Sequence, residues 1–185
     1  MMAELVLVRH ARVDERYRGV CYGRGDVALG AEGRADSLRL AAAIARWPVA
    51  RLVTSGAART GYLAEQIRAR TDLTAEVEPA LRERDFGSWE LQTWDAIYAE
   101  AGDAMHGLIH EPGTYRPPGG ETTFELRDRV MAWYDRRPRE GLVVALTHGG
   151  PIAAIRGTLQ GKHPVDWVDL IPAPGTWVAL PEGAA

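Results

Sequence analysis

Two short apolar runs, one near each end of the chain, each finish in a histidine. The first reads Leu-Val-Leu-Val-Arg-His at residues 5–10, and the second reads Leu-Val-Val-Ala-Leu-Thr-His at residues 142–148. Runs of this length fit buried strands, and in open α/β sheets the carboxyl ends of parallel strands carry the functional site. We therefore expect His10 and His148 to face one pocket, an arrangement typical of phosphoryl chemistry on histidine.

Each histidine alone is weak support for that interpretation. Arg-His is a common dipeptide, and His-Gly-Gly at residues 148–150 is ordinary strand-to-helix turn sequence. The hypothesis depends on what the rest of the chain places beside them.

The remaining pattern alternates strands with helices. Further strands are expected at residues 51–54, 75–77 and 176–180, and helices at residues 31–47, 57–70, 122–136 and 151–159. In the first helix Leu38, Ala41, Ala42 and Ala45 recur at helical spacing, and Thr122 with Glu125 has the spacing of a capping box. This alternation predicts a three-layer α/β/α sandwich with a mostly parallel central sheet.

Length and composition limit the organisation of the chain. A chain of 185 residues with 46% apolar composition fits one domain over residues 1–185. Residues 87–120 differ from the rest, with aromatic side chains among glycines and prolines, and we expect them to form a cap excursion of irregular backbone over a pocket.

Charge and targeting signals narrow the class of partner and the compartment. A net charge of −3 and a pI near 6.0 provide no basic field for nucleic acid. Cys21 is the single cysteine, so no internal disulfide is possible, and neither a basic leader nor a long apolar segment for a membrane occurs. We expect a cytoplasmic protein; the sequence leaves its oligomeric state open.

Six segments carry a family pattern in order along the chain. They are Leu-Val-Arg-His at 7–10, Gly-Arg-Gly-Asp-Val-Ala-Leu at 23–29, Ser-Gly-Ala-Ala-Arg at 55–59, Leu-Arg-Glu-Arg-Asp-Phe-Gly-Ser-Trp-Glu at 81–90, Pro-Gly-Gly-Glu-Thr at 118–122 and Thr-His-Gly-Gly at 147–150. Together they resemble the histidine phosphatase superfamily, also called phosphoglycerate mutase-like.

The resemblance implies an enzyme that needs neither a metal ion nor a cofactor. It implies that His10 is the nucleophile, that Glu83 is the proton donor, and that the phosphate is surrounded by Arg9, Arg59, His148 and Gly149. The chemistry agrees, because a neutral imidazole can attack phosphorus if its other ring nitrogen is held by a hydrogen bond. Guanidinium groups supply charge-assisted hydrogen bonds to the phosphoryl oxygens, and a carboxylic acid can protonate the leaving alkoxide.

Other interpretations of two of these residues remain open. Arg59 at a helix start is also typical of a surface arginine, and Glu83 is also placed to pair with Arg82 or Arg84. Asp85 and Glu90 are the second choices for the proton donor.

Contacts with the rest of the substrate are predicted at further residues. Tyr22, Gly23, Trp89 and Trp94 are expected to touch the organic part of the substrate. The family's Gly-Glu-Thr after the first histidine is replaced by Ala-Arg-Val at residues 11–13, and its asparagine is matched by Arg16, so Arg12 or Arg16 would have to replace those phosphate contacts.

The expected substrate is a small-molecule phosphate ester. Residues 19–29 are most similar to the α-ribazole phosphatase branch, which implies α-ribazole 5′-phosphate and a place in cobalamin biosynthesis, while residues 100–115 hold no arginine or lysine of the kind a mutase uses. The alternatives are a broad-specificity small-molecule phosphatase, a protein phosphohistidine phosphatase and a phosphate-binding module without catalysis.

Overall fold

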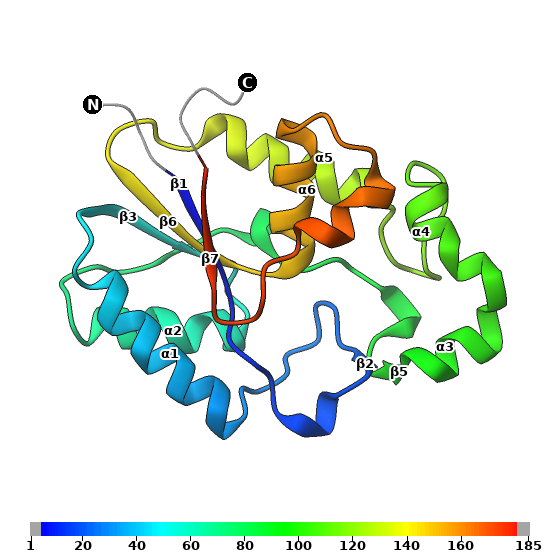
Figure 1. The fold of residues 1–185 in the computed structure, drawn as a ribbon, viewed down its shortest axis with the longest axis horizontal. Helices are drawn as coiled ribbons and strands as arrows, with labels where there is room; N and C mark the ends of the chain where they lie inside the picture. The colour runs from blue at the N-terminus through cyan, green and yellow to red at the C-terminus, as the bar shows by residue number, and fades with distance from the viewer. Residues whose placement is uncertain (1–4, 181–185) are drawn as a thin grey trace.

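A five-stranded sheet forms the centre of the protein, in a computed structural model that describes residues 5–180. The strand order is β4-β3-β6-β1-β7. The strands are β1 (Leu5–Arg9), β3 (Val49–Thr54), β4 (Glu76–Val77), β6 (Leu142–Thr147) and β7 (Trp177–Leu180). All neighbours pair in parallel except β7, which runs antiparallel to β1 at one edge (Figure 1). The mostly parallel sheet is confirmed.

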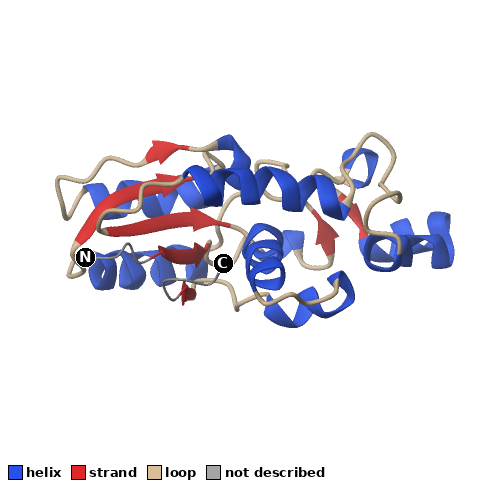
Figure 2. Ribbon diagram, turned by 90° about the horizontal axis from the view of Figure 1, so that it is seen from above, coloured by secondary structure: helices blue, strands red, loops and turns tan. Residues whose placement is uncertain are grey.

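Helices cover both faces of this sheet, which confirms the three layers (Figure 2). On one face lie α1 (Ala31–Ile44) and α2 (Ala58–Arg68), and on the other α5 (Thr123–Arg136) and α6 (Gly149–Leu159). Successive side chains of a strand point to opposite faces, so Leu5 and Leu7 join the core under α5 and α6, while Val6 and Val8 join the core under α1 and α2. Burial on both sides explains why β1 reads as an unbroken apolar run.

The buried face of α1 differs from the one expected. Leu38 is 39% exposed, whereas Leu40, Ala41 and Ile44 are buried. The alanines of this helix fit several faces equally well, and the larger apolar side chains decide between them because they remove more apolar surface from water. The capping box at α5 is confirmed, with Thr122 as its N-cap and Glu125 reaching back to the Thr122 backbone.

The segment at residues 87–120 is more regular than expected. It holds the short strand β5 (Gln92–Thr93), which pairs with β2 (Val20–Cys21) in a second, two-stranded sheet, then α3 (Trp94–Ala101), a 3-10 helix η4 (Gly102–His106) and α4 (Gly107–His110). Figure 1 shows these helices on the right of the molecule, away from the central sheet. They carry a small core of their own, and the prediction of irregular backbone was wrong for much of this segment.

The remaining 3-10 helices are η1 (Glu15–Tyr17), η2 (Pro79–Leu81), η3 (Gly87–Trp89) and η5 (Pro164–Leu170). In the part of the chain that the structure describes, every helix is too short or too polar to cross a membrane.

Packing of η5 on α6 provides a test of the fold. A Cβ added at Gly157 of α6 would lie 2.1 Å from Trp167 Nε1, which donates a hydrogen bond to the Lys162 carbonyl at 3.0 Å. A rigid indole cannot yield cheaply, so we expect Gly157→Ala to lower the free energy of unfolding by about 1–3 kcal/mol. Urea denaturation measures this change.

Gly61→Ala in α2 is the matched control. A Cβ at Gly61 meets no atom within 4 Å, so this variant is expected to raise the free energy of unfolding by about 0.5–1 kcal/mol. Equal changes in the two variants would show that η5 does not pack on α6 as described.

Candidate active site

The carboxyl ends of β1, β3 and β6 meet at one edge of the sheet. Arg9 pairs with Thr147 in the parallel ladder, so the next residue of each strand, His10 and His148, lie side by side with ring centroids 5.2 Å apart. Ser55 follows β3 at the same edge, and its amide donates to the Leu146 carbonyl at 3.0 Å. The structure thus brings together the two histidines that stand at opposite ends of the sequence.

The imidazole of His10 is buried and held in one tautomer. Its Nδ1 lies 2.7 Å from the Ala11 carbonyl oxygen, which can only accept, so the proton sits on Nδ1 and the lone pair on Nε2. Burial, helped by the positive charge of Arg59, lowers the pKa of His10 to about 3. His10 is therefore neutral, with a free lone pair, at any pH at which the protein would work.

His148 is also buried and neutral. Its Nδ1 accepts a hydrogen bond from Arg59 Nε at 3.2 Å, and its Nε2 lies 2.8 Å from the Ser55 hydroxyl. Since Nδ1 accepts, Nε2 carries the proton and donates to Ser55. Burial and the neighbouring charge of Arg59 hold the pKa of His148 well below its usual range.

Arg59 is a buried cation without a carboxylate partner among residues 5–180. At the start of α2 it is 1% exposed, which excludes a surface arginine. Its Nη1 and Nη2 donate to the carbonyls of Gly25 and Gly23 at 2.8 and 2.6 Å. Burial lowers the pKa of Arg59, yet an arginine guanidinium stays protonated in proteins, so carboxylates such as Glu83 and Asp26 balance its charge only from a distance.

Arg9 adds a second cation at the same edge. Its Nη1 donates to the Pro172 carbonyl at 2.7 Å, while its Nε is buried without a partner within the described residues. A buried donor left unpaired is costly unless a ligand takes the hydrogen bond. Gly149, at the start of α6, allows the close approach, since a Cβ there would lie 3.4 Å from Arg9 Cζ. The amino end of α6 adds a favourable environment for an anion.

Glu83 borders two cavities of the site. One, of about 200 Å³, is also lined by Arg59 and His148, and the other, of about 350 Å³, is also lined by Arg9. The carboxylate accepts from the amides of Arg84 and Gly150 at 2.8 and 3.3 Å. A carboxyl group at this boundary can exchange a proton with a group that spans both cavities.

The other carboxylates proposed for this role are occupied elsewhere. Asp85 pairs with Arg24 at 3.0 Å, and Glu90 accepts from the amides of Arg24 and Phe86 at 2.9 and 3.2 Å. Glu83 itself forms no ion pair with either neighbouring arginine in the described chain, since Arg84 instead donates to Thr123 Oγ1 at 2.7 Å. Geometry favours Glu83 over the alternatives.

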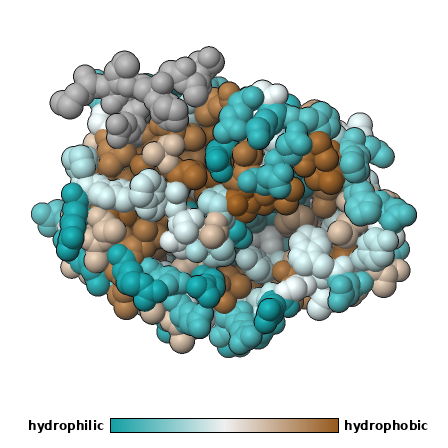
Figure 3. All heavy atoms as spheres, in the orientation of Figure 1, coloured by the Kyte–Doolittle hydropathy of each residue, from teal (hydrophilic) through white to brown (hydrophobic). Residues whose placement is uncertain are grey.

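The larger of the two cavities is mainly apolar. Its walls come from β2, α3, α4, α5, α6 and η5, and they include Phe86, Trp94, Leu126 and Trp167. Figure 3 shows apolar side chains gathered beside a hollow near the centre of the face in view. Such a lining fits an organic group with apolar or aromatic surface.

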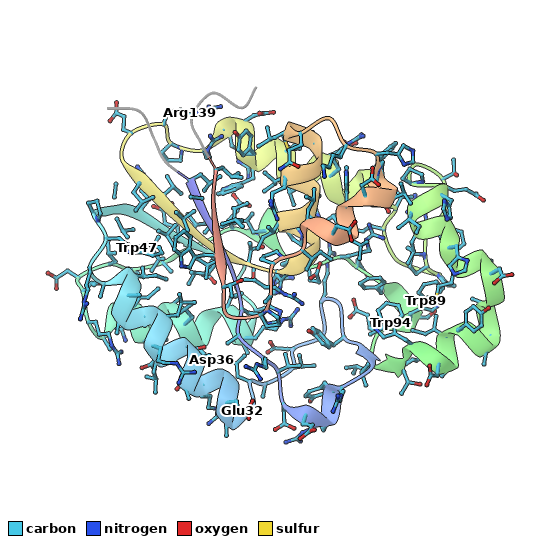
Figure 4. The ribbon with its side chains drawn as sticks, in the orientation of Figure 1. Glu32, Asp36, Trp47, Trp89, Trp94 and Arg139 are labelled. Atoms are coloured by element: carbon cyan, nitrogen blue, oxygen red, sulfur yellow. The ribbon has the colours of Figure 1, made fainter. Side chains whose placement is uncertain are left out.

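Among the residues expected to contact substrate, the structure separates two groups. Tyr22, Gly23 and Trp94 line the apolar cavity, and the Tyr22 ring lies 5.2 Å from Arg59 Cζ. Trp89 does not line it; it is 5% exposed and packs with Cys21 and Ile97, although Figure 4 shows it close to Trp94. Its ring packs in the small core of residues 87–120 and does not contact the cavity.

Arg16 is exposed and its Nε pairs with Asp14 at 2.8 Å, outside the cavities described above. The structure therefore does not bring Arg16 to the predicted phosphate contact. Arg12, another arginine of this loop, lines a cavity of about 660 Å³ together with His10 and Tyr22.

Three contributors to the site were not predicted from the sequence. The Ser55 hydroxyl accepts the hydrogen bond of His148 Nε2, the absence of a side chain at Gly150 leaves room for Glu83, and η5 supplies one wall of the apolar cavity. Only Ser55 had a usable signal, because it directly follows a predicted strand as the two histidines do.

Other nucleophiles and metal ligands are less well placed. Burial raises the pKa of the Cys21 thiol to about 12, which leaves it protonated. Across residues 5–180, no cluster of three or more His, Cys, Asp or Glu side chains is arranged to hold a metal ion.

Comparison with known proteins gives consistent matches over nearly the whole chain. A family model described as the histidine phosphatase superfamily (branch 1) matches residues 5–181. A glucosyl-3-phosphoglycerate phosphatase of Mycobacterium tuberculosis (strain ATCC 25618 / H37Rv) is 28% identical over 174 residues, which cover 88% of this chain and 78% of that protein. A 2,3-bisphosphoglycerate-dependent phosphoglycerate mutase of Mesorhizobium japonicum (strain LMG 29417 / CECT 9101 / MAFF 303099) is 28% identical over 182 residues, covering 92% and 87%.

The fold is also found among solved structures. The native structure of the mycobacterial glucosyl-3-phosphoglycerate phosphatase Rv2419c superposes with a TM-score of 0.83 at 26% identity, covering 97% of this chain and 90% of that one.

Burial of His10 predicts how stability depends on pH. An ordinary histidine has a pKa of 6.5, whereas that of His10 in the folded protein is about 3, so between these values the unfolded chain binds more protons. The contribution of His10 to stability is complete above about pH 6.5 and is lost as the pH falls toward 3. We expect the free energy of unfolding to change by about 1.4 kcal/mol per pH unit from this group.

Urea denaturation of the protein and of His10→Gln between about pH 4.5 and pH 7 isolates the contribution of His10 to the pH dependence of the free energy of unfolding. The carboxylates contribute alike in both proteins and cancel in the comparison. Parallel pH profiles for the two proteins would contradict the buried, neutral His10.

Proposed function

The chain belongs to the histidine phosphatase superfamily (branch 1), and from this premise we propose that it hydrolyses a small organic phosphate ester through a phosphohistidine at His10. The observation that carries the proposal is the environment of that side chain. The Ala11 carbonyl holds Nδ1 at 2.7 Å, so the lone pair of Nε2 is free, and the positive charges of Arg59 and Arg9 lie close enough to act on the ring.

The first chemical step moves the phosphoryl group to His10. The Nε2 lone pair forms a bond to phosphorus while the ester P–O bond breaks, and the oxygen of the leaving alcohol takes a proton from Glu83. Arg9 and Arg59 stabilise the charge on the phosphoryl oxygens. His148, whose two ring nitrogens are bonded to Arg59 and Ser55, holds the Arg59 guanidinium in place on the same side.

The second step releases phosphate. Water that replaces the leaving alcohol gives a proton to the Glu83 carboxylate and forms a new P–O bond, while the P–N bond breaks and His10 recovers its lone pair. The position of Glu83 between the two cavities supports both proton transfers.

The leaving group occupies the apolar cavity in this proposal. Phe86, Trp94 and Trp167 there favour a leaving group with an apolar or aromatic surface over a small hydrophilic sugar. α-Ribazole 5′-phosphate, whose leaving group carries an aromatic base, belongs to that class, and the similarity of residues 19–29 supports it. The named relatives act on, or are named for, phosphoglycerate derivatives, and these are the competing substrates.

A substrate panel tests the proposal. We expect phosphate release from α-ribazole 5′-phosphate or another aromatic ester to exceed that from phosphoglycerates and sugar phosphates by about a hundredfold in kcat/KM, or about 2.7 kcal/mol in transition-state binding. His10→Ala is expected to abolish release from every ester, with no metal added.

Turnover that survives in folded His10→Ala would contradict the histidine mechanism. Similar rates on all esters, lost in His10→Ala, would retain the mechanism and remove the aromatic preference. Vanadate or phosphate binding without any turnover would indicate a binding module, and turnover of a phosphorylated protein alone would indicate a protein phosphohistidine phosphatase.

Gly150→Ala tests the role of Glu83 without altering any functional group. The added Cβ would lie 2.2 Å from Glu83 Oε1, and the end of a flexible side chain can move away at low cost. We therefore expect the free energy of unfolding to change by at most about 1 kcal/mol. Without its proton donor in place, kcat/KM for an alkyl phosphate should fall by about a hundredfold.

Steady-state kinetics measure this effect, with Gly61→Ala as the control for the loss of a helical glycine. Full activity in Gly150→Ala would show that Glu83 does not need its present position.

A further inference from the structure

Glu83 stands on irregular backbone between η2 and η3, where no ladder of a helix or sheet fixes it. Its backbone carbonyl accepts from Arg129 Nη2 at 2.9 Å and from Arg24 Nε at 3.3 Å. Side chains from distant segments therefore hold the chain at the point where the carboxyl group branches from it.

Arg129 on α5 makes the larger share of these contacts. Its Nη1 donates to the Ala80 carbonyl at 2.6 Å, and Nε and Nη2 donate to the two carboxylate oxygens of Glu121 at 3.0 and 2.7 Å. Its side chain is 19% exposed and that of Glu121 is 12% exposed, so water competes little for these bonds. A planar guanidinium satisfies all these partners at once, which an ammonium group cannot do.

Glu121 fixes the backbone that follows Glu83 in the chain. Its Oε1 accepts from the Asp85 amide at 3.0 Å, and its Oε2 accepts from Arg24 Nη2 at 3.4 Å. Arg129 and Glu121 thus fix the backbone immediately before and after Glu83, from residue 80 to residue 85.

We propose that Arg129, together with Glu121, is a positioning residue that aims the Glu83 carboxyl group at the leaving oxygen; this inference rests on the proposed function. Arg129 makes no contact with the nucleophile among its hydrogen bonds, so its loss should affect proton donation more than attack on phosphorus. A displacement of about 1 Å in a catalytic group is enough to cost a large factor in rate.

Leaving groups separate positioning of the acid from general damage. p-Nitrophenolate leaves without a proton donor, whereas an alkoxide needs one. For Arg129→Gln we expect kcat/KM for an alkyl phosphate to fall at least about tenfold more than kcat/KM for p-nitrophenyl phosphate. Arg129→Lys keeps the positive charge but loses the planar set of donors, and it should show the same difference between the two esters. Glu121→Gln should show a smaller difference.

Two control variants show what no effect and a full effect on proton donation look like. Arg136→Gln removes an exposed arginine of the same helix that pairs with Glu78, and it should leave both substrates unchanged. Glu83→Gln should show the same preference for p-nitrophenyl phosphate as the Arg129 variants, but more strongly.

Equal losses on both esters in the folded Arg129 variants, or no loss on either, would overturn the inference. If Arg129→Gln does not fold, the conservative Arg129→Lys and Glu121→Gln variants decide the matter by the same ratio. Turnover that persists in His10→Ala would instead overturn the proposed function, so the two failures are distinguishable.

Discussion

Parallel pairing of β1 with β6 is the interaction on which the site depends. The register that sets Arg9 opposite Thr147 carries both histidines to one edge of the sheet, and the His10 amide continues the ladder by donating to the Thr147 carbonyl at 3.0 Å. Ser55 extends the neighbouring strand in the same way. Because these residues continue strands buried on both faces, their backbone is held nearly as firmly as the core, and a shift in register would separate the two rings.

Two arginine side chains at that edge form no ion pair with a carboxylate of the described residues. Arg59 is buried against carbonyl dipoles and not against a carboxylate, and the Nε of Arg9 is buried without a partner in the described chain. Removing cations from water without pairing them costs free energy that packing elsewhere must offset. The same desolvation keeps His10 and His148 uncharged, so in the proposed reaction the arginines attract the phosphate dianion while the Nε2 lone pair of His10 stays free.

The sequence was informative where function follows from a strand end and poor where it depends on contacts between distant segments. Apolar runs and the residue directly after them predicted the sheet and the proximity of His10 and His148, although the two side chains line different cavities. The prediction of the buried face of α1 was wrong because the alanines of this helix do not distinguish one face from another. The helices of residues 87–120 were missed because they are short: α3 spans Trp94–Ala101, α4 spans only Gly107–His110, and a 3-10 helix stands between them. The bonds of Arg129 to backbone carbonyls leave no pattern in the sequence at all.

In the proposed reaction, the phosphate and the leaving group therefore contact parts of the protein that are held in place by different interactions. The phosphate side stands on strand ends, where the backbone ladder sets its geometry. Glu83 and the apolar cavity stand on irregular backbone, on η5 and on the helices after residue 93, all held by side-chain contacts. Substitutions in the second group can alter which ester is accepted while the sheet edge still performs the same phosphoryl transfer.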